Sequence, residues 1–347
     1  MPRISRRDFA CAALAAAASP YILTSAQAAS SAAGPVDKTA GPIAVGAGVT
    51  GYTVDSIRHH SINTYWIEGR EGTIAIDALW RIPEAEEAMG AFQGITGRPA
   101  DTIGVIAITH PHSDHYGGLT TYRAAAGGAP AVATQAVQRV IRNDEHGFYA
   151  NRLQDIPEDI PPEIPIPSVG LQDGTPLTAA GATLETHILR DNEAIETALL
   201  YHAASGTLFT GDVVNHKTTP VLYQGGLDPW IEQLKGLRTR FPDARVIAPG
   251  HGTPGDFDIL VGDELAYLEF FRQQMEDELD RGGGFIGPEA ETRIAIAVAE
   301  AFPDWRTSAG VPSRDALIRL NIGFTLRGWR LQAGGDASPE EFRPDNG

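Results

Sequence analysis

The sequence predicts an α/β fold built from stacked layers of sheet and helix. Strand and helix patterns alternate through residues 63 to 143, strand patterns dominate from 174 to 214, and helix patterns follow residue 258. A sheet with helices followed by a second sheet with helices is typical of a layered α/β arrangement. The 347 residues are enough for a sizeable core, and no internal repeat interrupts the pattern.

The first predicted sheet begins with NTYWIEGREGTIAIDAL (63–79), in which two strands flank a turn at residues 69 to 72. The next segment, DTIGVIAITH (101–110), is an apolar run of the kind expected for a strand covered on both faces. GGLTTYRAAA (117–126) then predicts a helix, and APAVATQAVQRVIRND (129–144) predicts another strand followed by another helix.

The middle of the chain contains DIPEDIPPEIPIPS (155–168), whose prolines exclude a regular helix or a central strand. We expect an extended loop there, either a plain connector or a lid. Strand patterns return over residues 174 to 214, and RVIAPG (245–250) adds a further strand. Helices are predicted over ELAYLEFFRQQMEDELDR (264–281) and PEAETRIAIAVAEAF (288–302).

The N-terminal segment has the features of an export signal. An arginine pair in SRRDFA (5–10) precedes the apolar run ACAALAAAASPYIL, and SAQA (25–28) offers small residues for a cut after Ala28. This is the twin-arginine form, read by a receptor, and it predicts a periplasmic or secreted protein that meets the export machinery transiently. The alternative is a membrane anchor, although the apolar run is shorter than the roughly 20 residues of a span. Residues 29 to 42 are predicted to be a flexible leader.

Charge and cysteine content narrow the chemistry. The formal charge of −17 argues against nucleic acid and anionic membranes as partners, because both require a surplus of Lys and Arg. The single cysteine, Cys11, lies within the predicted signal, so the mature chain would have no disulfide, thiolate ligand or cysteine nucleophile. A metal would therefore be held by His, Asp and Glu, and a small molecule is the expected substrate.

The strongest motif is THPHSDHYGG (109–118), directly after an apolar strand. His110 and His112 can serve one ion, and Asp114 and His115 can serve a second ion close by. Neutral imidazole and carboxylate suit Zn²⁺ or another divalent ion of borderline softness. The alternative, a polar turn with chance histidines, requires four such residues to fall within six positions by accident.

Further candidate ligands stand at the ends of two later strands. LFTGD places Asp212 after one apolar strand, and APGHG places His251 after another. A single GD or GH dipeptide is usually a turn, but two of them at strand ends favour a shared site with the histidine cluster.

In these pieces, together with NTYWIEGREGTIAID, the chain resembles the metallo-β-lactamase superfamily over residues 45 to 255. The resemblance implies an αβ/βα four-layer sandwich over residues 43 to 258, with a helical extension (259–347) packed on the same domain. It implies that His110 and His112 bind the first metal, that Asp114, His115 and His251 bind the second, and that Asp212 bridges them. Asp77 would support the site rather than bind metal.

One position departs from the family pattern. Where most members have a third histidine, this chain has RDNEAIETALLYHA, and the alignment places Glu193 there. His187 is the alternative ligand, although it and His202 both lie within predicted strands. The segment NEAIE is similar to the T-E-A-P-A-E motif of the alkylsulfatase branch, in which glutamate is a ligand. The bridging Asp212 differs from the glutamate of that branch, so sulfate-ester specificity does not follow.

The resemblance implies a hydrolase with two divalent ions, Zn²⁺ or alternatively Fe or Mn, and a hydroxide between them. Asp114 would orient the hydroxide, and Asn215 or His216 would donate to the developing oxyanion, or alternatively cap a strand end. The predicted substrate is a small ester, lactone or sulfate ester. The alternatives are a β-lactam hydrolase, a mononuclear iron oxidoreductase of the persulfide dioxygenase type, and a non-catalytic binding protein.

Substrate preference is expected to lie outside the resemblance, in residues 146–153, 155–168 and 302–324. Aromatic and arginine residues there can line a pocket or serve as packing and surface: Phe148, Tyr149, Trp305, Arg306 and Arg314. The sequence does not indicate the oligomeric state.

Overall fold

The computed structural model describes residues 40–55, 61–308, 311 and 313–334. The predicted signal and most of the predicted leader lie outside these residues. The leader prediction was too long by two residues, because the first strand begins at Gly41.

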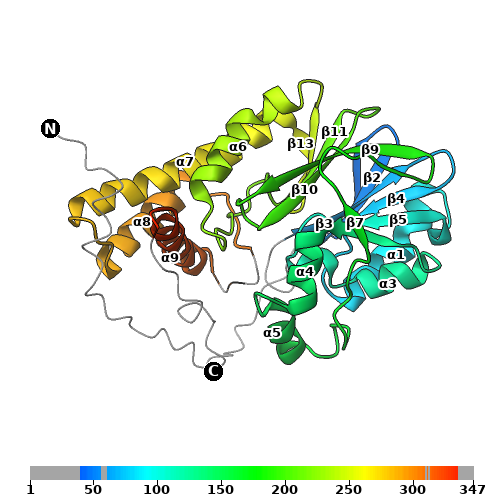
Figure 1. Cartoon of the computed structure of the whole chain (residues 1–347), viewed down its shortest axis with the longest axis horizontal. Helices are drawn as coiled ribbons and strands as arrows, with labels where there is room; N and C mark the ends of the chain where they lie inside the picture. Colours follow the sequence, from blue (N-terminus) through cyan, green and yellow to red (C-terminus); the bar gives the residue numbers. More distant parts are fainter. Residues whose placement is uncertain (1–39, 56–60, 309–310, 312, 335–347) are drawn as a thin grey trace.

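The described chain forms two sheets that pack face to face (Figure 1). The first has seven strands in chain order: β1 (Gly41–Gly46), β2 (Val49–Asp55), β3 (Ser61–Glu68), β4 (Thr73–Ile76), β5 (Ile103–Ala107), β6 (Ala131–Thr134) and β7 (Val169–Leu171). Neighbours are antiparallel from β1 to β4 and parallel from β4 to β7.

The second sheet has six strands in the order β13-β12-β11-β10-β9-β8. They are β8 (Leu177–Ala179), β9 (Ala182–Arg190), β10 (Glu196–His202), β11 (Thr207–Gly211), β12 (Val246–Pro249) and β13 (Gly255–Asp256). β11 and β12 are parallel, so their carboxyl ends meet at one edge, while the other pairs are antiparallel. Strands were predicted for β8 to β12 from the apolar and β-branched residues of these segments, whereas β13 was not predicted.

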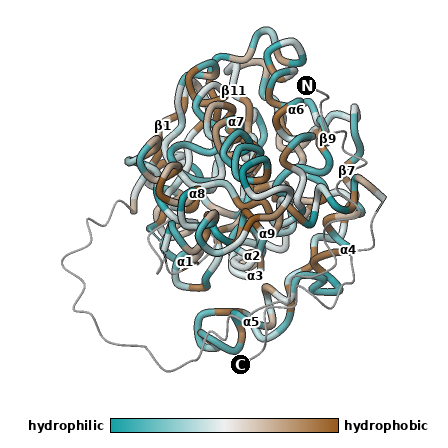
Figure 2. The backbone as a smooth tube through the Cα atoms, turned by 90° about the vertical axis from the view of Figure 1, so that its left-hand side faces the viewer, coloured by the Kyte–Doolittle hydropathy of each residue, from teal (hydrophilic) through white to brown (hydrophobic). Residues whose placement is uncertain are grey.

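Helices cover the outer face of each sheet. Over the first sheet lie α1 (Ile82–Thr96), α3 (Leu119–Ala125) and α4 (Gln135–Asn143). The same half of the chain contains three shorter helical segments, which are a 3₁₀ turn (Ala100–Thr102), α2 (Ser113–Tyr116) and α5 (Phe148–Asp155). Over the second lie α6 (Leu227–Arg240) and α7 (Phe257–Arg281), followed by α8 (Pro288–Ala301) and α9 (Arg314–Gln332). Figure 1 shows α8 and α9 at the end of the molecule away from the first sheet. Hydrophobic and hydrophilic residues alternate along these helices (Figure 2), as expected when one face is buried.

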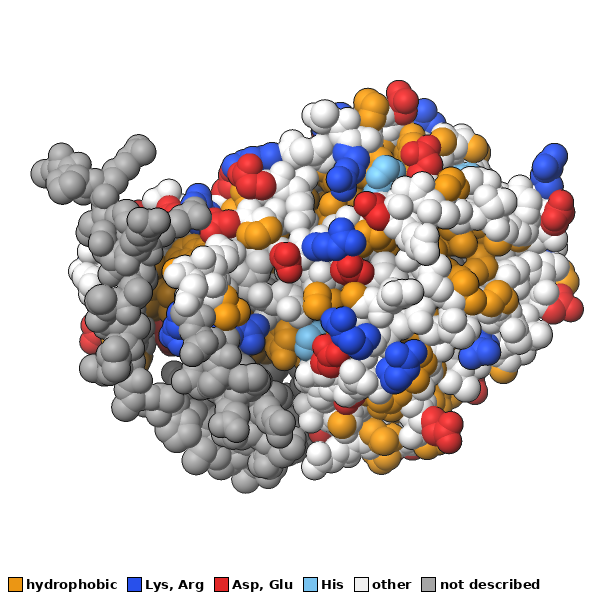
Figure 3. All heavy atoms as spheres, in the orientation of Figure 1, with side chains coloured by type: hydrophobic (Ala, Val, Ile, Leu, Met, Phe, Trp, Pro, Cys, Tyr) orange, Lys and Arg blue, Asp and Glu red, His pale blue; other side chains and the backbone are white. Residues whose placement is uncertain are grey.

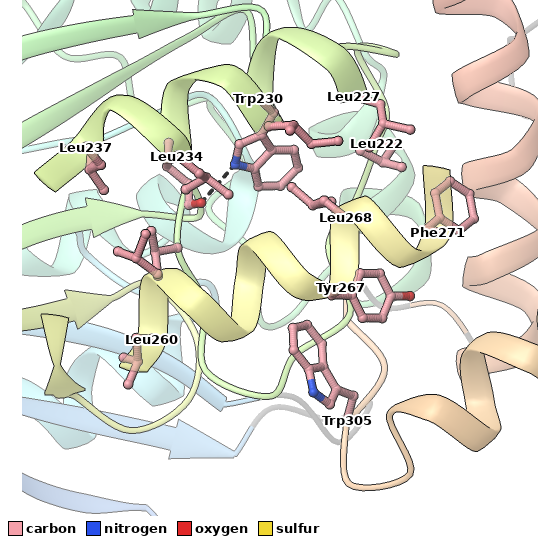
Figure 4. Close-up of a cluster of buried hydrophobic side chains, with 14 of the residues drawn as sticks. Leu222, Leu227, Trp230, Leu234, Leu237, Leu260, Tyr267, Leu268, Phe271 and Trp305 are labelled. Atoms are coloured by element: carbon pink, nitrogen blue, oxygen red, sulfur yellow. Dashed lines mark hydrogen bonds between the residues drawn. The ribbon is translucent and has the colours of Figure 1, made fainter. Parts of the chain in front are cut away.

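Three buried clusters correspond to the interfaces between these layers. One lies between the sheets and includes Tyr65, Val105, Leu200 and Phe209. A second joins the first sheet to α1, α3 and α4. The third joins the second sheet to all the later helices, with Trp230, Tyr267 and Phe271 among its members (Figure 4). This is the predicted αβ/βα four-layer sandwich with a helical extension, and the fold-class prediction is confirmed.

The helix α9 is fixed to the loop that follows β11. The Asn321 amide donates to Pro220 O at 2.8 Å, and its oxygen accepts the Leu222 N–H at 2.9 Å. Gly225 (φ +71°) and Gly328 are in direct backbone contact, since a Cβ on Gly328 would lie 2.0 Å from Gly225 O. Only glycine permits this approach at both positions.

The proline-rich segment 156–168 is irregular, as predicted, and is tied to the body of the protein. The Ile82 N–H donates to Asp159 O at 2.8 Å, and Arg81 forms an ion pair with Asp159 at 2.8 Å. The Tyr149 hydroxyl donates to Glu163 O at 2.9 Å. These contacts favour a connector over a lid. Among the described helices, none combines the length and hydropathy required to cross a membrane.

Candidate metal centre

The THPHSDHYGG motif forms the turn between β5 and α3, at the edge where the two sheets open. Gly117 and Gly118 let this turn lie directly on the segment that follows β4, because a Cβ on Gly118 would lie 2.2 Å from Ala78 O. The Ala78 N–H also donates to His115 O at 2.8 Å. The glycines of the motif therefore set the position of the ligands before them.

Asp77 holds this turn from behind. Its Oδ1 accepts the Thr109 N–H at 2.9 Å, and its Oδ2 lies 3.0 Å from His115 Nδ1. A carboxylate at Nδ1 fixes the ring and leaves Nε2 available to a ligand. Asp77 thus occupies the supporting position expected from the sequence.

Asp212 and His251 follow the parallel neighbours β11 and β12, so their side chains reach the same edge. A Cβ on Gly250 would lie 2.0 Å from Asp212 Oδ1, which explains the glycine before His251. The first sheet holds His251 in turn: its Nδ1 donates to Ser61 O, and the Asn63 amide donates to Gly252 O at 2.7 Å.

Six of the predicted ligands form two clusters. His110, His112 and Asp212 offer ligand atoms within 4.8 Å of one another, and so do Asp114, His115 and His251. Asp212 Oδ2 connects the two, lying 3.6 Å from His110 Nε2, 3.4 Å from His115 Nε2 and 3.0 Å from His251 Nε2. Asp114 Oδ2 lies 3.4 Å from His251 Nε2. The structure thus brings together six side chains that the sequence analysis named as metal ligands, with Asp212 next to both clusters.

Glu193 lies beside the first cluster, whereas His187 lies elsewhere. The Glu193 side chain is 3% exposed, with Oε1 3.9 Å from His112 Nδ1. Asn192 shapes the turn, since its oxygen accepts from the Ala194 N–H and the Thr197 hydroxyl. His187 instead packs on Phe241, with ring centroids 4.7 Å apart, and is in neither cluster.

The donor set fits cations. Within the described residues, several buried ligand atoms make no hydrogen bond: His110 Nε2, His112 Nε2, His115 Nε2, Glu193 Oε2 and Asp212 Oδ1. Buried polar atoms are almost always paired, so convergent unpaired atoms of this kind are suited to hold a metal ion.

The pKa shifts of two buried carboxylates also favour a site for cations. Burial, and then repulsion by Asp212 and Glu264, raises the pKa of Glu193 well above its ordinary value. Burial also disfavours the ionised form of Asp212, but His251, His115 and His110 outweigh it and hold the pKa of Asp212 well below the ordinary value. Divalent cations would compensate this concentration of buried carboxylates.

Asn215 and His216 have structural contacts rather than the predicted oxyanion contacts. The Asn215 amide donates to Asp212 O at 3.3 Å, and its oxygen accepts the His251 N–H at 3.1 Å. The His216 N–H donates to His251 O at 3.1 Å, and its imidazole is in neither cluster. Because both the nitrogen and the oxygen of the Asn215 side-chain amide already make hydrogen bonds, these contacts do not support a role in stabilising an oxyanion.

Glu264 was missed by the sequence analysis. It is fully buried on α7, and its Oε2 accepts the Asn215 N–H at 3.1 Å. It therefore supports the residue that links Asp212 to His251. A signal was present: Glu264 interrupts the apolar stripe of Leu260, Tyr267 and Phe271, and a lone acid on a buried helix face is rarely solvated.

The predicted pocket residues separate into two groups. The Phe148 ring contacts the His112 ring, with centroids 5.7 Å apart. Tyr149 is buried, and Trp305 stacks on Tyr267 at 4.5 Å inside the core (Figure 4). Arg314 donates to Val298 O at 3.2 Å, within the helical extension. Arg306 pairs through its backbone with Thr219, on the loop after β11. Of these five, only Phe148 is shown in contact with a predicted ligand.

Comparison with known proteins agrees with this geometry. The family model described as the metallo-beta-lactamase superfamily matches residues 57–251, more than half of the chain. The chain belongs to this superfamily. The match contains every predicted ligand and ends at His251, so α7, α8 and α9 lie beyond it.

Individual relatives are distant. The metallo-beta-lactamase type 2 of Bacteroides fragilis is 23% identical over 116 residues, which span 32% of this chain and 46% of that protein. A metallo-beta-lactamase family protein from Thermus thermophilus has a TM-score of 0.61 at 20% identity, covering 85% of this chain and 98% of its own. A double mutant of the sec-alkyl sulfatase PisA1 has a TM-score of 0.60 at 18% identity, covering 88% and 52%. These structures share the fold.

Proposed function

We propose that the protein is an exported, dinuclear metal-dependent hydrolase that acts on a small ester, lactone or sulfate ester. Membership of the superfamily and the two ligand clusters support a metal-dependent hydrolase-type function. The observation that carries the finer proposal is the position of Asp212, whose Oδ2 lies within 3.6 Å of a histidine of each cluster. A carboxylate so placed can be shared by two ions. Zn²⁺ is the proposed metal, since the ligands are imidazole and carboxylate.

Ions bound in the clusters would supply an activated water near neutral pH and would polarise the bond to be cleaved. The chain itself does the rest. Asp114 has the most exposed of the ligand carboxylates, at 14%, so it can take a proton from water and pass it to the leaving group. Asp77, Ser61 and Asn215 hold His115, His251 and Asp212 in place, so that little reorganisation accompanies the reaction.

The class of bond is tested with matched esters, lactones and sulfate esters, assayed with and without a chelator and with His112→Ala. The proposal expects hydrolysis of at least one class that is lost on chelation and restored by Zn²⁺. Hydrolysis indifferent to both treatments would contradict it. A β-lactam as the sole substrate would replace the substrate class but retain the metal mechanism, and one iron per chain with oxygen consumption would replace both.

The export proposal rests on the N-terminal sequence, in which an arginine pair precedes an apolar run and the small residues of SAQA (25–28). Replacing Arg6 and Arg7 together by lysine is expected to leave the protein in the cytoplasm, because the twin-arginine receptor reads this pair. The check is cell fractionation followed by immunoblotting, and unchanged export would refute the proposed route.

A further inference from the structure

A row of aromatic rings extends from the metal ligand His112 towards α9. Phe148 contacts His112 and lies 5.3 Å from Tyr223, which in turn lies 5.3 Å from Phe324. His146 flanks the row, 5.2 Å from Phe148 and 4.6 Å from Tyr223. All distances join ring centroids.

Three separate segments supply these rings. His146 comes from the connection of α4 to α5 and Phe148 is the first residue of α5, while Tyr223 comes from the loop after β11 and Phe324 from α9. His146, Phe148 and Tyr223 remain partly exposed, whereas Phe324 is buried behind them. A row of partly exposed rings that begins at a metal ligand presents apolar surface to whatever binds at the metals.

The rings are held in position rather than loosely exposed. The Asp144 carboxylate accepts the N–H groups of Tyr149 and Ala150, which fixes the first turn of α5 at Phe148. The Gly225–Gly328 contact fixes the loop of Tyr223 on α9. Arg327 lies over the Tyr223 and Phe324 rings, at 5.5 and 5.9 Å, and donates to Tyr223 O.

His146 adds no charge near neutral pH. Burial lowers the pKa of His146 to about 4, and the Gln224 amide donates to its Nε2 at 3.3 Å. The surface beside His112 is therefore largely aromatic, with the Arg327 guanidinium at its far end, in contrast to the acidic metal site next to it.

We propose that His146, Phe148 and Tyr223 form a subsite for an aromatic group carried by the substrate, next to the bond that is cleaved. This inference rests on the proposed function for the identity of that bond. Edge-to-face and offset contacts favour a ring over a short alkyl group of equal polarity. The subsite is completed by α9, which lies beyond the part of the chain that the family model matches.

The test compares two substrates that differ only in a phenyl group. They are ethyl phenylacetate and ethyl acetate, or 2-phenylethyl sulfate and ethyl sulfate if sulfate esters are the bond class accepted. We expect Phe148→Ala and Tyr223→Ala each to lower the ratio of kcat/KM for phenyl over non-phenyl substrate about tenfold, mainly through KM. Phe285→Ala, which removes a ring that is 55% exposed in the connection of α7 to α8, is the matched control and should leave the ratio unchanged.

A binding measurement separates failure of the subsite from failure of the proposed function. Saturation-transfer NMR on the chelator-treated protein, with 2-phenylethanol and ethanol as probes, requires no turnover. A phenyl signal in the wild type that both variants lose supports the subsite, even if no ester is hydrolysed and the proposed function fails. An unchanged substrate ratio in both variants, or no phenyl signal in the wild type, would overturn the subsite.

Discussion

The two ends of the metal centre are supported in different ways. At the His115–His251 end, each imidazole has a partner behind it: Asp77 for His115, and the Ser61 carbonyl for His251. At the His112–Glu193 end, neither His112 Nε2 nor Glu193 Oε2 has a hydrogen bond among the described residues, and the rings that contact His112 are those of His110 and Phe148. The first end is held by the fold, and the second faces the proposed subsite. Metal retention and substrate choice should therefore respond to different substitutions.

The largest effect is expected from removing the metals, because this affects both ends of the centre at once. Chelation should reduce hydrolysis to the uncatalysed rate and lower the unfolding temperature, because bound cations stabilise only the folded state and offset the repulsion of Glu193 by Asp212 and Asp114. Activity assays and thermal unfolding, before and after dialysis against a chelator, measure both. A protein whose unfolding temperature does not change would show that the carboxylates are compensated in some other way.

The next largest effect is expected at the His112–Glu193 end of the centre, which has less support from the fold. Glu193→Ala should lower the metal content by about one equivalent per chain, because the first cluster loses the buried carboxylate that lies beside His112. His187→Ala is the matched control, since His187 packs on Phe241 outside both clusters, and its metal content should equal that of the wild type. Elemental analysis of proteins purified in parallel decides between them. Loss of metal from His187→Ala alone would reverse the ligand assignment.

A smaller effect is expected at the supported end. Asp77→Asn keeps an oxygen for the Thr109 N–H but removes the charge beside His115 Nδ1, and losses of about 10- to 100-fold in metal affinity are usual for such partners. Competition with a fluorescent chelator measures the affinity. An affinity equal to that of the wild type would mean that the backbone alone orients His115.

The smallest effect concerns Glu264 and depends on pH. Burial, followed by repulsion from Asp212, raises the pKa of Glu264 well above its ordinary value, although the Asn215 N–H opposes the shift. The folded chelator-treated protein therefore retains this proton more strongly than the unfolded chain, and its stability falls as pH rises above the unfolded pKa. Glu264→Gln should gain stability relative to the wild type between about pH 5.5 and 8, measured by urea unfolding. A constant difference across that range would exclude this titration.

A companion variant tests the hydrogen bond rather than the charge. Glu264→Leu leaves the buried Asn215 N–H without an acceptor, which costs about 1–3 kcal/mol at any pH. It should be less stable than Glu264→Gln throughout, and equal stabilities would show that the contact has little weight.

The sequence predicted the part of the centre that local geometry determines. His110, His112, Asp114 and His115 fall on one turn after one strand, and Asp212 and His251 each follow an apolar strand, so the ligand set can be found from the order of the elements. The helix α6 was not predicted, although its buried residues hold the second sheet. Figure 4 shows Trp230 of α6 donating to a carbonyl, that of Val213, at 2.9 Å.

The remaining features depend on contacts between distant segments. His146 meets Gln224 across 78 residues, and Glu264 meets Asn215 across 49. No periodicity within either segment specifies such pairs. The contact of the Asn215 oxygen with the His251 N–H, across 36 residues, was not predicted for the same reason. The charge pattern did not help to locate the site, because acidic and basic side chains are interspersed on the face of the molecule that Figure 3 shows.

The contact between Gly225 and Gly328 also orders events in time. During synthesis, the loop that follows Asp212 cannot settle until α9 has emerged, more than one hundred residues later. The ligands would then be present on the nascent chain well before the surface that is to choose a substrate. For a protein exported by the proposed twin-arginine route, a product that stops short of α9 would carry an unfinished loop to the export machinery. Completion of the loop beside the metal centre would thus depend on synthesis having reached α9.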